Sequence, residues 1–266
     1  MRRPLILEFR LLFFSILGVI IPFGALLYFF PGGTDTYWTW PIPEPRSAML
    51  IGAAYLGAIL YYVAALHQND WQQVENGLGG LITFSLVLLA ATMVHWNAFK
   101  PYHPITLVWL AFYYGGPFLV PIFYRLQIHR MGVAADEGVK LAPAVRAWLI
   151  GRGVLYGVLA LLGFTFANTI AAGWPWSIQP LEVRVFVGQI ALVSWGGLIA
   201  MRRRWAWPWH RLGVLSAGAI GAVQLVGLLI GPTAYQVSSP LGAVLPVVFA
   251  EWLTVAVVLF VLYRRQ

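Results

Sequence analysis

The sequence alternates between long apolar stretches and short polar segments. Each apolar stretch holds about 20 residues, and a helix of that length crosses a hydrocarbon core roughly 30 Å thick because it rises 1.5 Å per residue. We therefore predict an all-α, polytopic helical membrane protein with eight transmembrane helices. The predicted spans are 10–30, 47–66, 78–98, 105–125, 147–170, 183–201, 212–231 and 241–263.

The basic residues indicate how these helices are oriented. Cytoplasmic loops of membrane proteins carry an excess of Lys and Arg. With the N-terminus inside, the inner segments hold thirteen basic residues against three outside, which predicts cytoplasmic N- and C-termini and an even number of crossings. The inner set is Arg2, Arg3, Arg10, Arg125, Arg130, Lys140, Arg146, Arg202, Arg203, Arg204, Arg211, Arg264 and Arg265; the outer set is Arg46, Lys100 and Arg184.

Composition narrows the class of protein. Hydrophobic residues make up 60% of the chain and charged residues 10%, which is far from the balance of a soluble domain. The net charge of +8 follows from the topology signal, so we expect no nucleic-acid partner. The basic, aromatic segment Arg202–Arg211 is either an anionic-lipid contact or simply a topology determinant. A multi-pass protein of the cell (cytoplasmic or inner) membrane is the predicted localisation.

A short signature occurs twice at a fixed distance. Trp38 and Trp40 recur as Trp174 and Trp176, an offset of 136 (174 − 38), and Arg10 and Arg146, Gly52 and Gly188, and Trp71 and Trp207 share that offset. This spacing predicts a tandem duplication of a four-helix unit. The predicted parts are a first repeat at 1–126, a cytoplasmic linker at 127–145 and a second repeat at 146–266. Four crossings per unit give the repeats the same orientation, with a symmetry axis along the membrane normal.

The paired tryptophans fall near the ends of predicted spans. Indole rings favour the headgroup level, where the ring is partly buried and its N–H stays wet. We expect six interfacial anchors; an aromatic ligand cage is the other interpretation. They are Trp38, Trp40, Trp174, Trp176, Trp71 and Trp207.

Glu251 is the least expected residue because it falls near the middle of the last predicted span. An ionised carboxylate at the centre of a transmembrane helix is costly, so Glu251 must be protonated, paired or facing a wet interior. Gln224 reaches a similar depth and is a candidate hydrogen-bond partner. Gln189 and Arg152 lie nearer opposite faces, and Arg152 has the length to snorkel to the surface. A structural bond and a proton- or ligand-linked role both fit Glu251.

The fourth predicted span contains Tyr113, Tyr114, Gly115, Gly116 and Pro117. Two glycines and a proline at mid-span weaken the backbone ladder, and an irregular backbone at that depth is tolerated where it lines a cavity. Interrupted spans near a repeat interface are typical of transporter sites. The alternative is a packing kink without a ligand.

Near the outer end of the third span lie His95, Asn97 and His103. A shallow metal or pigment site is one interpretation of this outer polar cluster, and hydrogen-bonded interfacial histidine is the other. No metal and no cofactor are expected. The sequence has no cysteine, and Lys100 and Lys140 lie outside the spans, so a retinal Schiff base has no attachment point.

The segments Trp38–Pro41 and Trp174–Trp176 each lead into a helix that carries a paired glycine, and a tryptophan follows each helix. This pattern resembles one found in uncharacterised bacterial polytopic membrane proteins built from one or two four-helix units. The resemblance covers most of the chain. It implies a bacterial inner-membrane origin and a non-enzymatic role, and it brings no assigned function or site residue.

Three functions remain open. The first is a binding or transport protein for a small molecule, lipid or proton, with a site between the repeats. The second is a non-catalytic subunit or scaffold that meets membrane protein partners through the small residues of the seventh span, 213–222. The third is an integral membrane enzyme that works on lipid or isoprenoid substrates, with His95, His103, Asp70 or Glu75 as acid–base groups, although the predicted topology puts the histidines and the acids on opposite sides.

Overall fold

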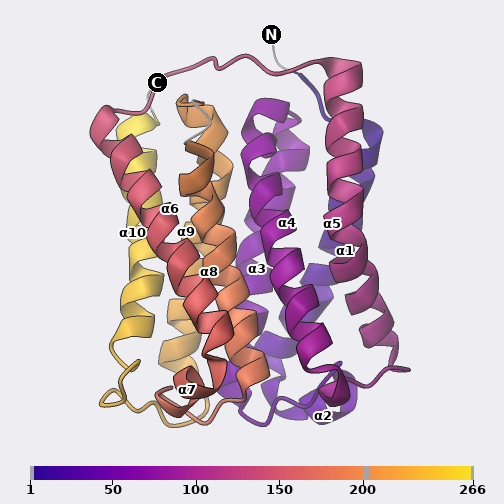
Figure 1. Cartoon of the computed structure of the whole chain (residues 1–266), viewed down its shortest axis with the longest axis vertical. Coiled ribbons are helices and arrows are strands. Elements are labelled where there is room, and N and C mark those ends of the chain that lie inside the picture. Colours follow the sequence, from indigo (N-terminus) through magenta and orange to yellow (C-terminus); the bar gives the residue numbers. More distant parts are fainter. Residues whose placement is uncertain (1–2, 201–203, 265–266) are drawn as a thin grey trace.

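The computed structural model describes residues 3–200 and 204–264, and all secondary-structure elements in these ranges are helical. Eight helices are long and run roughly side by side in one bundle (Figure 1). They are α1 (Leu7–Phe29), α3 (Pro45–Gln68), α4 (Trp71–Val94), α5 (Pro104–Met131), α6 (Pro143–Thr165), α8 (Pro180–Ala200), α9 (Trp207–Ile230) and α10 (Val244–Tyr263). The short elements α2 (Thr34–Tyr37) and α7 (Ala167–Ala172), with turns Pro31–Gly33 and Trp96–Ala98, lie in the connections.

Seven helices of the described chain are long and apolar enough to cross a membrane: α1, α3, α4, α5, α6, α9 and α10. The stretch predicted as the sixth span forms α8, which packs against α4 and α6, and its last predicted residue lies outside the described residues. The protein is therefore a helical, multi-pass membrane protein, and the count of eight crossings stays a prediction.

Both ends of the described chain lie at one end of the bundle, which we call the terminal end; the opposite end is the distal end (Figure 1). An even number of crossings requires this arrangement. The assignment of the terminal end to the cytoplasm stays a prediction from the positive-inside pattern.

Local sequence explains the sharp turn between α3 and α4. Asn69 ends α3 in the left-handed conformation (φ 47°), which Asn tolerates better than most residues. Asp70 follows and accepts a hydrogen bond from the Gln72 amide (3.2 Å), so it caps the N-terminus of α4. Asp70 thus has a structural role at the start of α4.

The two halves of the bundle interleave. Helix α1 packs on α3 and α6 packs on α8 within the halves, whereas α3 packs on α9 and α4 packs on α8 between them. One large hydrophobic core accordingly contains residues of both halves, from Leu5 to Phe249. The boundaries 1–126 and 146–266 stay predictions about duplication; they do not delimit separate cores.

Backbone hydrogen bonds recur at the 136-residue offset. Each half repeats one bond at its terminal end and one at its distal end, with nearly the same length. The bonds are Trp71 N to Arg3 O (2.8 Å) with Trp207 N to Val139 O (2.7 Å), and Lys100 N to Thr39 O (2.9 Å) with Gln236 N to Pro175 O (2.9 Å). These pairs support a tandem duplication, which itself stays a prediction.

The six paired tryptophans are buried, between 0% and 8% exposed, which corrects the expectation of partly exposed rings at the headgroup level. Each indole packs against another aromatic ring of the protein, and such ring pairs add to the stabilisation that burial gives. Ring centroids lie 5.8 Å apart for Trp38 and Trp40, 5.6 Å for Trp174 and Trp176, 5.6 Å for Trp71 and Tyr124, and 5.5 Å for Trp207 and Tyr263.

The polar linker crosses the terminal end of the bundle between α5 and α6 (Figure 1). The Asp136 carboxylate accepts hydrogen bonds from the amides of Ala206 (3.1 Å) and Trp205 (3.3 Å) and contacts the Lys140 ammonium at 2.5 Å. Burial raises the pKa of Asp136, but these hydrogen bonds outweigh it, so the pKa lies below its ordinary value of 3.8. The linker is thereby fastened to the start of α9.

This lowered pKa predicts a pH dependence. A carboxylate with a lowered pKa stabilises the folded state above its unfolded pKa and loses that contribution as the pH falls through the folded pKa. We expect the Trp205 and Ala206 amides to stay protected from hydrogen exchange until the pH is below 3.8. Asp136→Asn should speed their exchange at neutral pH. Equal exchange in the variant and the wild type would contradict this role of Asp136.

The crossing of α3 and α9 depends on a glycine. A Cβ at Gly57 would lie 2.4 Å from the Ile220 Cα, whereas a Cβ at Gly157 of α6 meets nothing within 4 Å. We expect Gly57→Ala to destabilise the protein by about 1–3 kcal/mol through overpacking. Gly157→Ala should be neutral or stabilising by up to about 1 kcal/mol. Unfolding in mixed micelles measures both, and a stabilised Gly57→Ala variant would rule out the close crossing.

Candidate functional site

Glu251 of α10 is paired with Arg152 of α6. The Arg152 guanidinium donates from Nε to Oε1 (2.6 Å) and from Nη2 to Oε2 (2.9 Å). The Tyr156 hydroxyl donates to Oε2 (2.8 Å), and Trp252 Nε1 donates to that hydroxyl (3.1 Å). Two parallel bonds from one guanidinium to one carboxylate form the strongest type of protein ion pair.

This pairing corrects two expectations. Glu251 does not bond Gln224, because the Gln224 amide donates to Gln189 Oε1 (2.6 Å) and to the Leu50 carbonyl (3.4 Å). Arg152 does not snorkel to the surface, since its side chain is 11% exposed and turned toward Glu251. The charge of each residue is balanced by the other, so neither has to reach water.

Breaking this pair should weaken the fold. Glu251→Gln leaves the Arg152 guanidinium without its counter-charge; a fully buried pair loses about 3–5 kcal/mol in that case. We expect the lower end, because the Glu251 side chain is 29% exposed. The double variant Arg152→Gln with Glu251→Gln should recover much of the loss. A double-mutant cycle of unfolding free energies measures the coupling, and additive losses would contradict it.

Helix α5 is continuous through residues 113–117, which corrects the expectation of a broken span. Pro117 and Pro121 lie inside the helix without ending it. The Tyr113 hydroxyl lies 2.9 Å from the Tyr55 hydroxyl of α3, and a Cβ at Gly116 would lie 3.3 Å from Ser85 Oγ of α4. Tyr114 is 54% exposed, and Gly115 faces only Leu119, so these two do not join the interior groups.

A cavity of about 330 Å³ lies among α1, α3, α4 and α5, with α8 and α9 closing one side. Most of its lining is aliphatic or aromatic. Its polar lining residues include Ser15, Tyr55, Tyr62, Ser85, Tyr113 and Gln189. The structure therefore gathers three of the predicted site residues, Tyr113, Gly116 and Gln189, around one interior space.

The predicted duplication relates the ion pair to this cavity. At the 136 offset Arg152 corresponds to Ile16 (152 − 136), and at the 139 offset that aligns the last helices Glu251 corresponds to Phe112 (251 − 139). Ile16 and Phe112 both line the cavity. Under the predicted duplication, the salt bridge of the second half therefore corresponds to two apolar lining residues of the cavity.

A smaller cavity of about 120 Å³ adjoins the first toward the terminal end. Arg152, Asn76 and His210 line it, together with Trp209 and Ser216. It shares with the 330 Å³ cavity five lining residues: Ala58, Tyr62, Leu81, Leu192 and Ile220. The predicted site is therefore divided: Arg152 lies at this smaller cavity, and Tyr113, Gly116 and Gln189 at the larger one.

The outer polar cluster does not form a metal site. His95 Nε2 lies 2.6 Å from an Arg184 guanidinium nitrogen, and His103 Nδ1 accepts from the Ile105 amide (3.3 Å) as the cap of α5. Asn97 is exposed. An arginine against His95 repels a metal cation, and no group of three acidic or histidine side chains within the described ranges is placed to hold one.

Sequence reasoning assigned Arg46 to an outer loop, but its side chain is buried at the distal end (3% exposed). It donates to the carbonyls of Leu228 (2.5 Å), Gly231 (2.9 Å) and Thr233, which satisfies the open C-terminus of α9. Glu182 is likewise fully buried at the first turn of α8 and accepts the Gln179 amide (2.6 Å). Neither residue stands out in the sequence, since both lie at predicted span ends.

The basic segment 202–211 is only partly described, because residues 202 and 203 lie outside the described ranges. Arg204 turns into the protein: it forms an ion pair with Glu75, and its guanidinium stacks 4.2 Å from the Trp209 ring. The expectation that this segment contacts anionic lipid is therefore corrected at Arg204, whose guanidinium contacts Glu75 and Trp209 instead.

Comparison with known proteins gives no relative. No family model, no curated protein and no solved structure matches this chain. The functional conclusions below therefore depend on the geometry of the described residues.

Proposed function

We propose that this protein is a membrane-embedded binding or transport protein for an apolar or amphipathic small molecule. The observation that carries this proposal is the 330 Å³ cavity inside the bundle. Ligand cavities in proteins span about 300–1,000 Å³, with apolar walls and a few placed polar groups. The walls here fit that description, because the hydroxyls of Tyr55 and Tyr113 and the Gln189 amide are set among aliphatic and aromatic side chains.

The asymmetry of the two halves supports the same proposal. A cavity in a purely structural core is unfavourable, because the side chains that line it lose packing contacts. The first half has such a cavity where, under the predicted duplication, the second half has a salt bridge. The salt bridge of Arg152 and Glu251 stabilises the second half. The first half retains a cavity at the corresponding place, and its boundary helix α5 has only sparse contacts with α1. Movement of α5 offers a route from the lipid phase to the cavity.

The alternative function is that of a non-catalytic subunit or scaffold. Its sequence argument was the run of small residues along the seventh predicted span, Gly213, Ser216, Ala217, Gly218, Ala219, Gly221 and Ala222. Two of its glycines serve the protein itself: a Cβ at Gly218 would lie 2.3 Å from Ala256 Cβ, and one at Gly221 2.5 Å from the Phe249 carbonyl oxygen. Contact of α9 with α10 thus uses part of the surface that a partner would need, and we favour the binding function.

Filling the cavity tests the proposal. Val108 lines it on α5, whereas its neighbour Leu107 is 59% exposed on the outer face. In lipid nanodiscs we expect a diazirine-bearing dodecanol to label the cavity residues of α1 and α5 in the wild type. Val108→Trp should reduce this labelling to background, and Leu107→Trp should leave it unchanged. Labelling confined to lipid-facing residues such as Phe118, in all three proteins, would overturn the proposal.

A further inference from the structure

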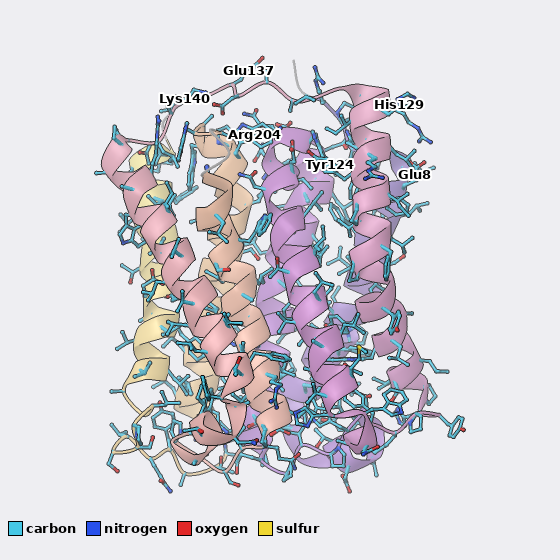
Figure 2. All side chains as sticks on the ribbon, in the orientation of Figure 1. Glu8, Tyr124, His129, Glu137, Lys140 and Arg204 are labelled. Atoms are coloured by element: carbon cyan, nitrogen blue, oxygen red, sulfur yellow. The ribbon has the colours of Figure 1, made fainter. Side chains whose placement is uncertain are left out.

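A third cavity, of about 500 Å³, lies at the terminal end of the bundle. Helices α4 and α5 form two of its walls, Trp195 of α8 a third, and Arg204 reaches it from the segment before α9. Figure 2 labels Arg204 and Tyr124 at this same end of the molecule. Its lining is richer in polar groups than that of the 330 Å³ cavity, because it contains charged, amide and hydroxyl side chains.

The charges in this cavity do not balance. Glu75 forms an ion pair with Arg204, and the Tyr124 hydroxyl donates to the same carboxylate oxygen, Oε1 (3.0 Å). Arg125 also lines the cavity, is exposed, and has no carboxylate partner among the described residues. Two arginines against one glutamate leave one positive charge, which favours an anion there.

A buried donor points to the same ligand chemistry. Asn76 is 9% exposed, and its Nδ2 has no hydrogen-bond partner in the described structure. An unpaired buried amide N–H is costly, so such a group in a cavity wall favours a ligand that accepts a hydrogen bond. Asn76 lines both the 500 Å³ cavity and the 120 Å³ cavity.

The polar cavity adjoins the apolar one. Val120 of α5 lines both of them, so a single side chain separates the two spaces at that point. The 120 Å³ cavity also adjoins both, because it shares Asn76 and Trp195 with the polar cavity and Leu192 with the apolar one. A molecule with a polar head and a hydrocarbon tail fits this arrangement, with its head in the 500 Å³ cavity and its tail in the 330 Å³ cavity.

We propose that the 500 Å³ cavity binds the anionic head group, a phosphate or carboxylate, of an amphiphile whose hydrocarbon tail occupies the 330 Å³ cavity. This inference rests on the proposed function, since it assigns the tail to the cavity already described. Arg125 and Arg204 supply the charge, and Asn76 Nδ2 supplies a neutral donor. Glu75 holds Arg204 in place and disfavours a second negative charge close to itself.

Native mass spectrometry of the full chain in a neutral detergent tests this proposal with dodecyl phosphate, dodecanol, dodecyltrimethylammonium and inorganic phosphate as probes. We expect dodecyl phosphate to bind at least about tenfold more tightly than dodecanol, because a hydrogen bond to a charged group contributes about that factor. Arg125→Gln should remove most of the difference. Arg130→Gln, which removes a charge from the same end of α5 but pairs with Glu8, is the matched control.

The outcomes separate the head-group proposal from the proposed function. Equal binding of dodecyl phosphate and dodecanol, or tighter binding of the cationic amphiphile, overturns the anionic head-group site while leaving the apolar cavity in place. Binding of inorganic phosphate as tight as that of dodecyl phosphate shows a free-anion site and overturns the amphiphile. If Val108→Trp leaves dodecanol and dodecyl phosphate binding unchanged, the proposed function itself fails.

Discussion

The need to partner every charge and polar group within the bundle shapes this protein. Water is absent from the bilayer core, so a buried charge must find its partner on a neighbouring helix. Arg152 and Glu251 tie α6 to α10 by two parallel hydrogen bonds, and Gln224 meets Gln189 across α9 and α8. At the distal end the buried Arg46 guanidinium donates hydrogen bonds to backbone carbonyls at the end of α9. Each of these bonds fixes which helices are neighbours.

The interleaving of the halves follows from the same contacts and explains why the cavities lie where they do. Because α3 packs on α9 and α4 on α8, the second and third helices of each half are held by the other half. The first and last helices lie at the periphery. In the second half Arg152 and Glu251 join these peripheral helices directly, whereas in the first half Ile16 and Phe112 face a hollow. Ile16 and Phe112 are apolar, so they cannot form a salt bridge across the cavity as Arg152 and Glu251 do between α6 and α10.

Sequence patterns predicted the all-α fold class and the approximate places of the long helices, but not the neighbours of each helix. Glu251 is conspicuous as a carboxylate in an apolar run, yet its partner Arg152 lies ninety-nine positions away (251 − 152) on another helix. Hydrophobic periodicity predicts that helix but not which helices it packs against. The six tryptophans stand out by their spacing, but the fact that Trp38 and Trp71 are buried depends on rings from other helices. Glycine and proline at 113–117 suggested a break, but the helix continues through them and Tyr113 contacts the Tyr55 hydroxyl of α3.

The distribution of polar groups around these cavities gives the interior a direction. Toward the terminal end the cavity walls carry the charged side chains of Arg125, Arg204 and Glu75, and toward the middle they are mostly aliphatic and aromatic, with a few hydroxyls and the Gln189 amide. That gradient is the one a single amphiphile in a membrane leaflet experiences, with its head at the surface and its tail inside. Under the proposed function, a molecule that enters from the leaflet at the terminal end would keep its orientation as it moves beside α5. The first half would bind it without turning it over, and helices α8 and α9 of the second half would form the opposite wall.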